Sequence, residues 1–352
     1  MIRVLVDGRM VRGARHGIAR YTLSLVEELV HHGGFELVVA AHPDEARSFL
    51  DLGAAVAPTR VAFVSVRASL ELSKLERAVH PDAVFCPSFV VPLLPRAPLV
   101  MTLHDATHLQ SPGDYSRAVA AYYRLVTLPA ARRAASVLTV SEASSSALRR
   151  WTKLDDVQVI PNGVDSRNFH AGGPLDPRIP TGCILYAGGF KPHKRVEMLI
   201  DALALLPGVP LALAGAVPQP LRERAWSSGL GGRWLELGLV DDEVLAAAYR
   251  AATVFAYPSC SEGFGLPPLE AMACGTAVVC SALSSLPEVV GDAAMLFQGD
   301  ARELAAALRS VLDDEVRRRE MIQRGAARAR VFTWQRAGVH LAAVLQRAAG
   351  SS

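Results

Sequence analysis

The segment VFAYPSCSEGFGLPPLEAMACG, residues 254–275, decides the fold because it joins a strand, a glycine-rich loop and a helix. Its first residues, 254–256, form a short apolar run typical of a buried parallel strand. The glycines of GFG at 263–265 predict a tightly turning loop, and the prolines at 267–268 suit the first turn of a helix that Gly275 ends. A helix N-terminus after such a loop offers free N–H groups and a positive dipole, which predicts an anion site suited to phosphate.

Two glutamates frame this loop. Glu270 is expected in the first turn of the helix, where a carboxylate can accept two hydrogen bonds from a vicinal diol such as a ribose. Glu262 precedes the glycines, where it can meet a sugar hydroxyl or a developing charge. Taken singly, Glu270 can be an acid favoured by the helix dipole, and Glu262 a solvated loop residue. The loop, the prolines and both acids together favour a binding site.

Apolar runs alternate with helical patterns on both sides of this segment. The expected strands are 2–6, 35–41, 83–86, 99–103, 137–140, 184–187, 211–214, 254–256 and 277–279. The expected helices include 21–30, 196–206, 242–251, a long charged helix at 301–330 and a final one from 333–334. Continuous apolar strands interleaved with helices predict parallel sheets covered on both faces. Residues 171–182 hold three glycines and three prolines, which predicts a linker or domain edge between two α/β domains.

The loop after the strand at 184–187 carries a cluster of cations. It reads LYAGGFKPHKR at 185–195, and its two glycines remove side-chain bulk at the strand end. Four candidate cations follow within five residues: Lys191, His193, Lys194 and Arg195. The chain has only four lysines among its 37 Lys and Arg residues, and two of them lie here. A compact ammonium is a good partner for a diphosphate, whereas a solvated basic turn is the plain alternative.

Two weaker signals lie in the first half of the chain. The loop DGRMVRGARHGIARY, residues 7–21, holds Gly17 just before a helix, where a phosphate or sugar can approach the backbone. Its glycines lack the tight spacing of a dinucleotide fingerprint. His104 follows the strand at 99–103, and a structural histidine is the alternative to a catalytic one. Because ligands bind at the carboxyl ends of parallel strands, two such domains facing each other predict a cleft between them.

The composition excludes several classes of protein. With 51% hydrophobic and 20% charged residues, the chain has the apolar content of a folded protein and is not disordered. A net charge of +3 falls short of a dedicated nucleic-acid binder, so no nucleic-acid partner is expected. Five cysteines without a C-x-x-C pair argue against a zinc site or a disulfide framework, and no cluster of Asp, Glu and His predicts another metal site. The short apolar N-terminus and the lack of a membrane-length apolar run predict a cytoplasmic protein.

Two stretches leave membrane contact open. Residues 65–80 and 115–133 have apolar faces with Arg or Lys, which suit helices lying on an anionic lipid surface. Ordinary amphipathic surface helices are the alternative. Peripheral contact with the inner face of the membrane is therefore one expectation, and the oligomeric state stays open.

These segments in this order resemble the retaining glycosyltransferases of glycosyltransferase family 4. The blocks that carry the likeness are VSEASSSALRRW (140–151), VIPNGVD (159–165), LYAGGFKPHKR (185–195), SEGFGLPPLEAMACGTAVVCS (261–281) and SSLPEVVGDAA (284–294). The opening DGR…GIARY with LHDATHLQSP (103–112) is similar to a bacterial subgroup rich in mannosyltransferases of polysaccharide assembly.

The resemblance spans essentially the whole chain and implies the α/β architecture called GT-B. This fold has two Rossmann-like, doubly wound parallel-sheet domains that face each other across a cleft. Residues 1–168 would form the acceptor-side domain and 169–331 the domain that binds the nucleotide sugar. Residues 332–352 would form a helix that returns to the first domain.

The resemblance also implies roles for single residues. Glu270 would hold the ribose hydroxyls, Glu262 would lie near the donor sugar and its leaving phosphate, and Lys194 would neutralise the diphosphate. Gly17 would let that diphosphate approach, and His104 would contact the donor sugar. The expected donor site comprises Gly17, Gly188, Gly189, Lys191, His193, Lys194, Glu262, Gly263, Phe264, Gly265, Leu266 and Glu270. The expected catalytic residues are His104, Lys194 and Glu262.

One departure from the family pattern concerns the second phosphate-binding cation. Family members commonly carry an Arg beside the lysine, at positions that are Gly189 and His193 here. A neutral histidine is a weaker diphosphate partner than an arginine. Lys191 or Arg195 is the expected substitute.

The resulting hypothesis is the transfer of a hexose from a nucleoside-diphosphate sugar to a hydroxyl of a glycan, oligosaccharide or glycolipid, with retention at the anomeric carbon. GDP-mannose is the favoured donor, and neither a cofactor nor a metal is expected because cations and backbone amides stabilise the leaving diphosphate. The alternatives are a transferase that uses a UDP- or dTDP-sugar on a natural product or lipid-linked acceptor, a nucleotide-sugar epimerase, a phosphorylase, and a non-catalytic nucleotide-sugar-binding subunit.

Overall fold

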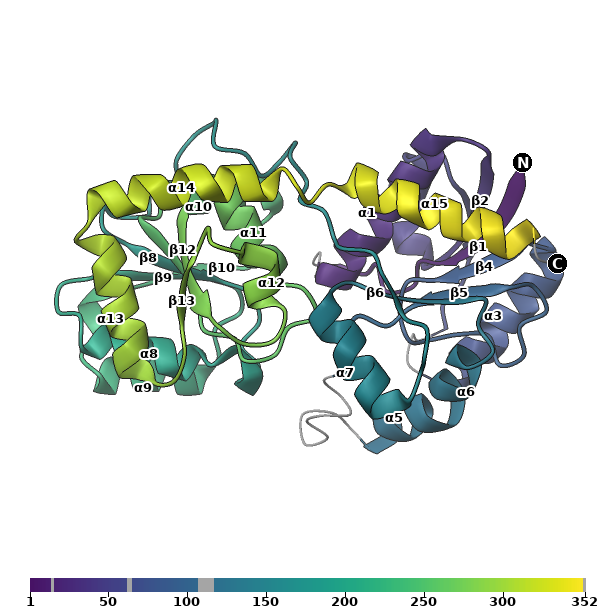
Figure 1. The fold of residues 1–352 in the computed structure, drawn as a ribbon, viewed down its shortest axis with the longest axis horizontal. Helices are drawn as coiled ribbons and strands as arrows, with labels where there is room; N and C mark the ends of the chain where they lie inside the picture. Colours follow the sequence, from purple (N-terminus) through teal and green to yellow (C-terminus); the bar gives the residue numbers. More distant parts are fainter. Residues whose placement is uncertain (14–15, 62–64, 107–116, 351–352) are drawn as a thin grey trace. The chain divides into compact units, whose positions relative to one another are not determined.

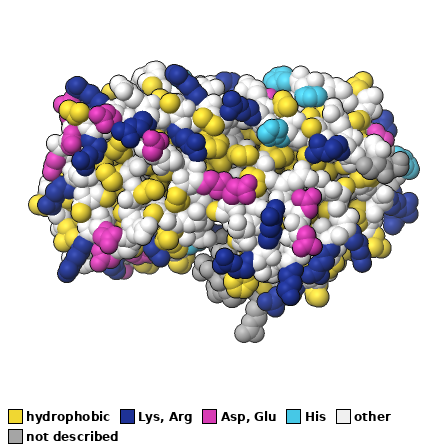
Figure 2. Space-filling view, viewed as in Figure 1, with side chains coloured by type: hydrophobic (Ala, Val, Ile, Leu, Met, Phe, Trp, Pro, Cys, Tyr) yellow, Lys and Arg dark blue, Asp and Glu magenta, His cyan; other side chains and the backbone are white. Residues whose placement is uncertain are grey.

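The computed structural model describes residues 1–13, 16–61, 65–106 and 117–350. The chain forms two compact units (Figure 1). Unit 1 comprises Met1–Gly163 and Trp334–Ser352, and unit 2 comprises Val164–Thr333. The boundaries expected at 168/169 and 331/332 therefore lie a few residues from those observed. On the face drawn in Figure 2, basic side chains are interspersed with acidic and apolar ones on each unit.

Unit 1 is built on a seven-stranded parallel sheet with the order β3-β2-β1-β4-β5-β6-β7. Its strands are β1 (Ile2–Asp7), β2 (Phe35–Ala41), β3 (Ala55–Pro58), β4 (Ala83–Cys86), β5 (Leu99–Thr102), β6 (Ser136–Thr139) and β7 (Gln158–Val159). Its helices are α1 (Gly17–His32), α2 (Ala46–Leu50), α3 (Val66–Val79), α5 (Arg117–Tyr122), a π-helical turn (Tyr123–Thr127), α6 (Leu128–Ala131), α7 (Glu142–Thr152) and α15 (Trp334–Gly350). The order of the strands reverses between β1 and β4, and such a reversal opens a crevice at the carboxyl edge of the sheet.

Unit 2 repeats this design with a six-stranded parallel sheet in the order β10-β9-β8-β11-β12-β13. Its strands are β8 (Ile184–Ala187), β9 (Leu211–Ala214), β10 (Trp234–Gly238), β11 (Val254–Tyr257), β12 (Ala277–Ser281) and β13 (Met295–Phe297). Its helices are α8 (Val196–Ala204), α9 (Gln219–Ser227), α10 (Asp242–Ala251), α11 (Leu266–Ala273), α12 (Leu286–Val290), α13 (Ala301–Leu312) and α14 (Glu315–Ala329). The strand order reverses between β8 and β11, the two strands that precede the motif-rich loops.

The predicted parallel sheets are confirmed, and the reason is visible in the burial of their strands. Every residue of β4, β5, β8, β9, β11 and β12 is buried, as expected for apolar runs covered on both faces. In unit 1, α1 and α15 pack against each other (Figure 1). Gly338 makes their contact close, because a Cβ there would lie 2.4 Å from the Cβ of Glu28.

The two segments where the chain passes between the units pair with each other. The backbone N–H of Val164 donates to the carbonyl of Phe332 at 3.0 Å, and Val164 forms a parallel bridge with Thr333. Unit 2 therefore begins and ends at neighbouring points, and α15 follows directly as the last helix of unit 1.

Of the two alternatives for residues 171–182, a linker is wrong, because this segment lies inside unit 2. It lies near the start of that unit, which begins at Val164, so a domain edge describes it better. The N–H of Asp176 donates to the carbonyl of Ala247 in α10, and Arg250 Nε donates to the carbonyl of Pro174 at 2.9 Å. The buried Asp176 carboxylate also pairs with Arg178 at 2.7 Å. Many glycines and prolines exclude helix and strand here, but hydrogen bonds to a neighbouring helix still order the segment.

The long helix predicted at 301–330 is two helices, α13 and α14. The break falls at residues 313–314, where the Asp314 carboxylate accepts a hydrogen bond from the N–H of Arg317 at 2.9 Å. This bond caps the N-terminus of α14. Asp313 is the C-cap of α13, so two consecutive aspartates mark the end of one helix and the start of the next. Within the described part of the chain, no helix has the length and apolar character needed to cross a bilayer.

Candidate active site

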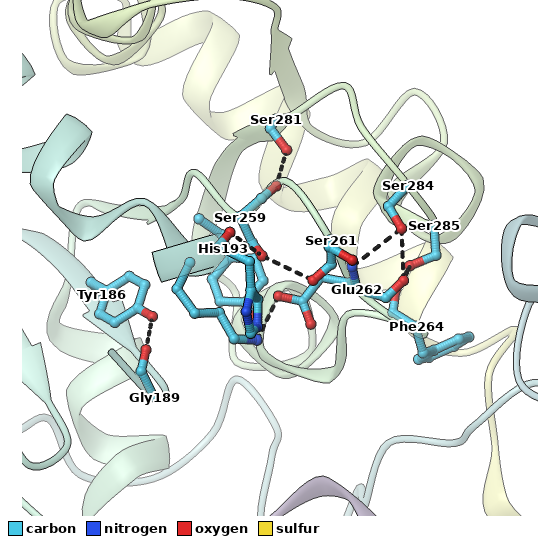
Figure 3. A network of polar contacts seen from close by, with 12 residues as sticks. Tyr186, Gly189, His193, Ser259, Ser261, Glu262, Phe264, Ser281, Ser284 and Ser285 are labelled. Atoms are coloured by element: carbon cyan, nitrogen blue, oxygen red, sulfur yellow. Dashed lines mark hydrogen bonds and ion pairs between the residues drawn. The ribbon is translucent and has the colours of Figure 1, made fainter. Parts of the chain in front are cut away.

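The two loops at the strand reversal of unit 2 are fastened to each other. Strands β8 and β11 are hydrogen-bonded neighbours, so the loops that follow them leave the same edge of the sheet. The carbonyl of His193, in the first loop, accepts a hydrogen bond from Cys260 N in the second loop at 2.8 Å. It also accepts one from Ser259 Oγ in that loop at 3.2 Å (Figure 3). Segments far apart in sequence thus form one surface, as the sheet order requires.

The centre of this surface is an ion pair between two of the expected catalytic residues. Lys194 Nζ donates to Glu262 Oε1 at 2.6 Å and to the hydroxyl of Tyr257 at 3.0 Å. The Lys194 and Glu262 side chains are 16% and 11% exposed, so the pair is shielded but reachable by a ligand. The sequence predicted both residues for the site, and the structure adds that they bind each other.

Two tyrosines of this site were not predicted. Tyr257, the last residue of β11, and Tyr186, in β8, are buried and stack with ring centroids 6.0 Å apart and planes at 18°. The Tyr186 hydroxyl donates to the carbonyl of Gly189 and so holds the glycine turn (Figure 3). Burial, followed by the negative charge of Glu262, raises the pKa of both phenols, so both are neutral. A tyrosine near the end of a buried strand was the available signal, because its polar tip reaches the loops.

Glycines occur in the loops where the backbone requires them. Gly188 and Gly265 have φ values of +143° and +109°, a region that other residues rarely adopt. A Cβ at Gly265 would also lie 2.7 Å from Leu286 Cδ2. Gly189 is exposed and Gly263 half-buried beside Glu262. These positions keep the loop backbones free of side-chain bulk.

Phe264 and Leu266 complete the second loop. The buried Phe264 ring packs edge-to-face against Phe332 at 5.4 Å, so its side chain is part of the packing of unit 2. Leu266 is the first residue of α11. The expected role of 263–266, donation by backbone N–H groups, is compatible with this placement and remains a prediction.

Serines after β12 fix the backbone around Glu262. Ser284 Oγ donates to the Glu262 carbonyl at 2.8 Å and lies 3.2 Å from the Glu262 N–H (Figure 3). Ser285 Oγ donates to the Phe264 carbonyl at 2.7 Å, and Ser281 Oγ donates to the Ser259 carbonyl. A third loop thus holds the glycine-rich loop in one conformation.

The prediction that Glu270 lies in the first turn of its helix was wrong. Helix α11 begins at Leu266 after Gly265, so its first turn is residues 266–269 and Glu270 starts the second. The prolines at 267–268 occupy two first-turn positions and lack N–H groups, which leaves fewer donors than the predicted anion site assumed. Glu270 is 4% exposed, and the Tyr249 hydroxyl donates to its Oε2 at 3.3 Å. Its carboxylate therefore accepts a hydrogen bond from Tyr249.

The other predicted cations of the first loop differ in exposure. Lys191 is exposed, while His193 and Arg195 are half-buried. Arg195 has a φ of +51° and precedes α8, so its backbone forms the sharp turn into that helix. The structure brings all three into the loop that carries Lys194.

Gly17 and His104 lie at the carboxyl edge of the sheet in unit 1. Gly17 is exposed and is the first residue of α1. His104 follows β5, its Nε2 lies 2.9 Å from the carbonyl of Pro87, and its ring meets Tyr21 edge-on at 4.7 Å. Burial lowers the pKa of His104, so the ring is neutral, Nε2 donates to Pro87, and Nδ1 is an acceptor. The segment 107–112 of the LHDATHLQSP block lies outside the described residues.

The same edge of unit 1 holds a buried ion pair. Arg9 donates to both carboxylate oxygens of Asp7, with Nε at 2.7 Å and Nη2 at 2.9 Å, and its Nη1 donates to the carbonyl of Ala68. Burial opposes the charge of Arg9, but the Asp7 carboxylate prevails and raises the pKa of the guanidinium. Arg9 therefore stabilises the conformation of its own loop. Arg15 of the same loop lies outside the described residues.

A separate cavity of about 360 Å³ opens beside β13 and α14 in unit 2. Its arginines, Arg317 and Arg324, pair with Asp314 and Glu320 on the same helix.

Two family models match the chain. One, described as Glycosyltransferase Family 4, matches residues 15–168, and the other, Glycosyl transferases group 1, matches residues 180–328. The chain is 34% identical over 277 residues to O-antigen chain mannosyltransferase B of Escherichia coli, a match that covers 71% of this chain and 70% of that protein.

Other relatives are matched over smaller parts of their length. The chain is 34% identical over 235 residues to the MMP alpha-(1->4)-mannosyltransferase of Mycolicibacterium hassiacum, covering 62% of this chain and 55% of that protein. It is 37% identical over 167 residues to the serotype-specific mannosyltransferase WbdA of Escherichia coli, covering 44% of this chain and 20% of WbdA.

Solved structures share the whole architecture. Sucrose-phosphate synthase from Thermosynechococcus elongatus superposes with a TM-score of 0.79 at 22% identity, covering 100% of both chains. The lipopolysaccharide glycosyltransferase WaaG superposes with a TM-score of 0.74 at 15% identity, covering 98% of this chain and 99% of that one. With its family models, its curated relatives and its two reversed parallel sheets, this chain belongs to the family 4 glycosyltransferases and has the GT-B fold.

Proposed function

We propose that this glycosyltransferase transfers mannose from GDP-mannose to a hydroxyl of a glycan or glycolipid, with retention at the anomeric carbon and without a metal ion. The observation that carries the proposal is the shielded Lys194–Glu262 pair at the strand reversal of unit 2. Support for mannose comes from the relatives, because O-antigen chain mannosyltransferase B and the MMP alpha-(1->4)-mannosyltransferase are both named for that sugar.

The chemistry of the proposal centres on the leaving group. The bond between the anomeric carbon and the phosphate oxygen breaks, and its electron pair goes to the nucleoside diphosphate. The acceptor oxygen forms the new bond, and its proton goes to the leaving diphosphate. Lys194 would stabilise the charge that develops on the diphosphate, which is the most effective place for a fixed cation.

The remaining residues of the proposed site would bind and orient the donor. Glu270, hydrogen-bonded by Tyr249, would accept the ribose hydroxyls. Glu262 would hold Lys194 and lie near the sugar, and Lys191 or Arg195 would supply the second phosphate cation. In unit 1, His104 presents Nδ1 as an acceptor, which suits a hydrogen bond from a sugar hydroxyl. These assignments rest on residue types and on the motif.

A UDP-sugar is the second candidate donor. A GT-B protein of Anabaena, HepE, superposes with a TM-score of 0.75 at 21% identity, and its structure is described as a complex with UDP-glucose. HepE shares its fold with this chain, and this supports a nucleotide-sugar site. The base of the donor is what the first experiment determines.

The first experiment measures thermal stabilisation by GDP, UDP, TDP and ADP at matched concentrations, with EDTA present. A ligand at about 100 times its Kd adds about 2.7 kcal/mol of stability, which is an easily visible shift. We expect GDP to stabilise most, and Glu270→Ala to abolish the shift while the matched Glu223→Ala, at an exposed position of α9, retains it. No shift with any nucleotide would contradict the proposal and favour a subunit without a donor site.

A second experiment tests the transfer itself. With GDP-mannose and mannoside acceptors in EDTA, the product's anomeric configuration is read by NMR. An α-linked product confirms retention, because the donor is α-linked. A β-linked product, or activity that needs an added metal ion, would contradict the mechanism. Consumption of the nucleotide sugar without an acceptor product would favour the epimerase alternative.

We also propose that the enzyme works in the cytoplasm, with peripheral contact to a membrane. Helix α3 supports this, because it exposes Val66 and Leu70 four residues apart, with Arg67 beside them. Sedimentation with anionic vesicles tests it, and we expect Leu70→Asp to weaken the binding. Binding equal to that of the wild type would assign α3 to the ordinary surface.

A further inference from the structure

The hydrogen bonds of Lys194 leave one donor for a ligand. An ammonium has three N–H groups, and Lys194 uses one on Glu262 at 2.6 Å and one on the Tyr257 hydroxyl at 3.0 Å. The third has no partner among the residues that the structure describes. Because two bonds fix the orientation of the ammonium, they also fix where this third N–H points.

The two anchors of Lys194 differ in burial. Glu262 lies on the glycine-rich loop and is 11% exposed. Tyr257 lies at the end of a central strand and is fully buried, and its ring stacks on Phe255 at 5.8 Å as well as on Tyr186 at 6.0 Å. The ammonium also lies 5.4 Å from the centroid of the Tyr257 ring. Tyr257 is therefore the more deeply packed of the two residues that hold the flexible four-carbon stem of Lys194.

The chemistry of Tyr257 suits this task. A neutral phenol accepts a hydrogen bond from the ammonium without cancelling its charge, whereas a second carboxylate would neutralise the cation that a diphosphate needs. The surroundings of Tyr257 keep it neutral, since burial and the Glu262 carboxylate both disfavour a phenolate. The hydroxyl thus orients Lys194 and leaves its full charge available.

We propose that Tyr257 is a positioning residue, whose hydroxyl fixes the Lys194 ammonium so that its remaining N–H faces the diphosphate of the donor. This inference rests on the proposed function, because it requires a diphosphate at Lys194. It predicts that the effect of the Tyr257 hydroxyl on ligand binding depends on Lys194.

A double-mutant cycle on the full chain tests the inference. Tyr257→Phe removes one hydroxyl and keeps the ring stack, and Lys194→Met keeps the apolar stem and removes the cation. We measure GDP and UDP binding by calorimetry. We expect Tyr257→Phe to weaken binding of the preferred diphosphate about fivefold to tenfold in the wild-type background, and less than about twofold in the Lys194→Met background.

Tyr122→Phe is the matched control. It removes the hydroxyl of another buried tyrosine, which bonds Ser69 Oγ at 2.6 Å in unit 1. We expect both Tyr→Phe variants to lower the urea midpoint by similar amounts, and only Tyr257→Phe to weaken diphosphate binding. This comparison separates a loss of orientation at Lys194 from a general loss of packing.

The outcomes are distinguishable. If Tyr257→Phe binds the diphosphate as the wild type does, or weakens it equally in both backgrounds, the positioning role is overturned while the proposed function stands. If the wild type binds none of GDP, UDP, TDP and ADP, the proposed function fails, and the inference fails with it.

Discussion

Each unit has an ion pair at the carboxyl edge of its sheet, next to the strand reversal, and the two pairs differ in burial. In unit 1, the side chains of Arg9 and Asp7 are 2% and 0% exposed and form two hydrogen bonds to each other. In unit 2, those of Lys194 and Glu262 are 16% and 11% exposed and form one. The basic residues differ as well, since a guanidinium binds a carboxylate with two parallel bonds and an ammonium acts as a point charge.

The difference indicates two uses for the same pair of charges. Arg9 donates hydrogen bonds to Asp7 and to the carbonyl of Ala68, so its loop is fixed before any ligand binds. Lys194 keeps one N–H and some solvent access, so it can exchange or extend its contacts when an anion binds. We therefore expect mutations in unit 1's pair to act on stability and mutations in unit 2's pair to act on turnover.

The largest effect is expected for Asp7→Ala. It leaves the Arg9 guanidinium buried without its carboxylate, which costs about 3–5 kcal/mol of the free energy of unfolding. Urea denaturation, with hydrogen exchange of the β1 amides to locate the loss in unit 1, measures it. Glu36→Ala is the control, because its pair with Arg3 is 43% and 47% exposed and contributes at most about 1 kcal/mol. If both variants lose the same free energy of unfolding, burial does not make the Arg9–Asp7 pair more stabilising than an exposed pair.

The second effect is expected for Lys194→Ala. Loss of the cation at the leaving diphosphate lowers turnover on the order of 100-fold. The free energy of unfolding falls by less than in Asp7→Ala, because the Glu262 carboxylate left behind is 11% exposed and reaches solvent. Initial rates with the preferred nucleotide sugar and urea denaturation measure the two quantities. Lys74→Ala is matched to it, since Lys74 is an exposed lysine 3.9 Å from Glu71 in unit 1. Unchanged turnover in Lys194→Ala would make this pair structural, like that of unit 1.

The third effect concerns the loop that supports Glu262. Gly265→Ala places a Cβ 2.7 Å from Leu286 at a φ of +109°, which costs about 1–3 kcal/mol and displaces the loop. We expect both the midpoint temperature of unfolding and the initial rate of transfer to fall. Gly232→Ala is the control, because a Cβ there meets nothing within 4 Å. A stable and fully active Gly265→Ala would show that the loop conformation is not needed.

The smallest effect is a pH dependence in unit 1. Burial lowers the pKa of folded His104, so the unfolded chain binds the proton first and stability falls as the pH drops below about 6.5. Nearby Asp105 opposes this shift, and His16, whose own pKa burial also lowers, adds to it. Urea denaturation from pH 8 to 5 is expected to show a shallower decline in His104→Gln than in the wild type. Parallel curves would mean that His104 does not contribute.

The sequence predicted the central strands well and the edge strands poorly. The runs at 35–41, 83–86, 184–187 and 211–214 have the observed bounds, because buried parallel strands are continuously apolar between polar ends. The edge strands β3, β7, β10 and β13 were missed. An edge strand is paired on one side only and tolerates exposed or short stretches, so its pattern is weak.

For the site, the sequence predicted which loops matter but not how their side chains pair. The sequence pattern locates Gly188 and Gly265 directly, because the requirement for glycine there comes from the local backbone conformation. The bond between Lys194 and Glu262 depends on β8 and β11 being neighbours, a tertiary fact. Tyr257 at the end of its strand was only a weak signal, because an aromatic residue in an apolar run is typical of any strand.

The placement of α15 has a consequence for how the chain folds during synthesis. Unit 2 is complete once Thr333 has left the ribosome, but unit 1 still lacks the helix that packs on α1, with the Trp334 ring 6.1 Å from that of Tyr21. The unit that is synthesised first is therefore finished last. Until α15 arrives, the face of α1 around Tyr21 stays uncovered while unit 2 folds as a continuous segment, which gives the nascent chain a defined order of assembly.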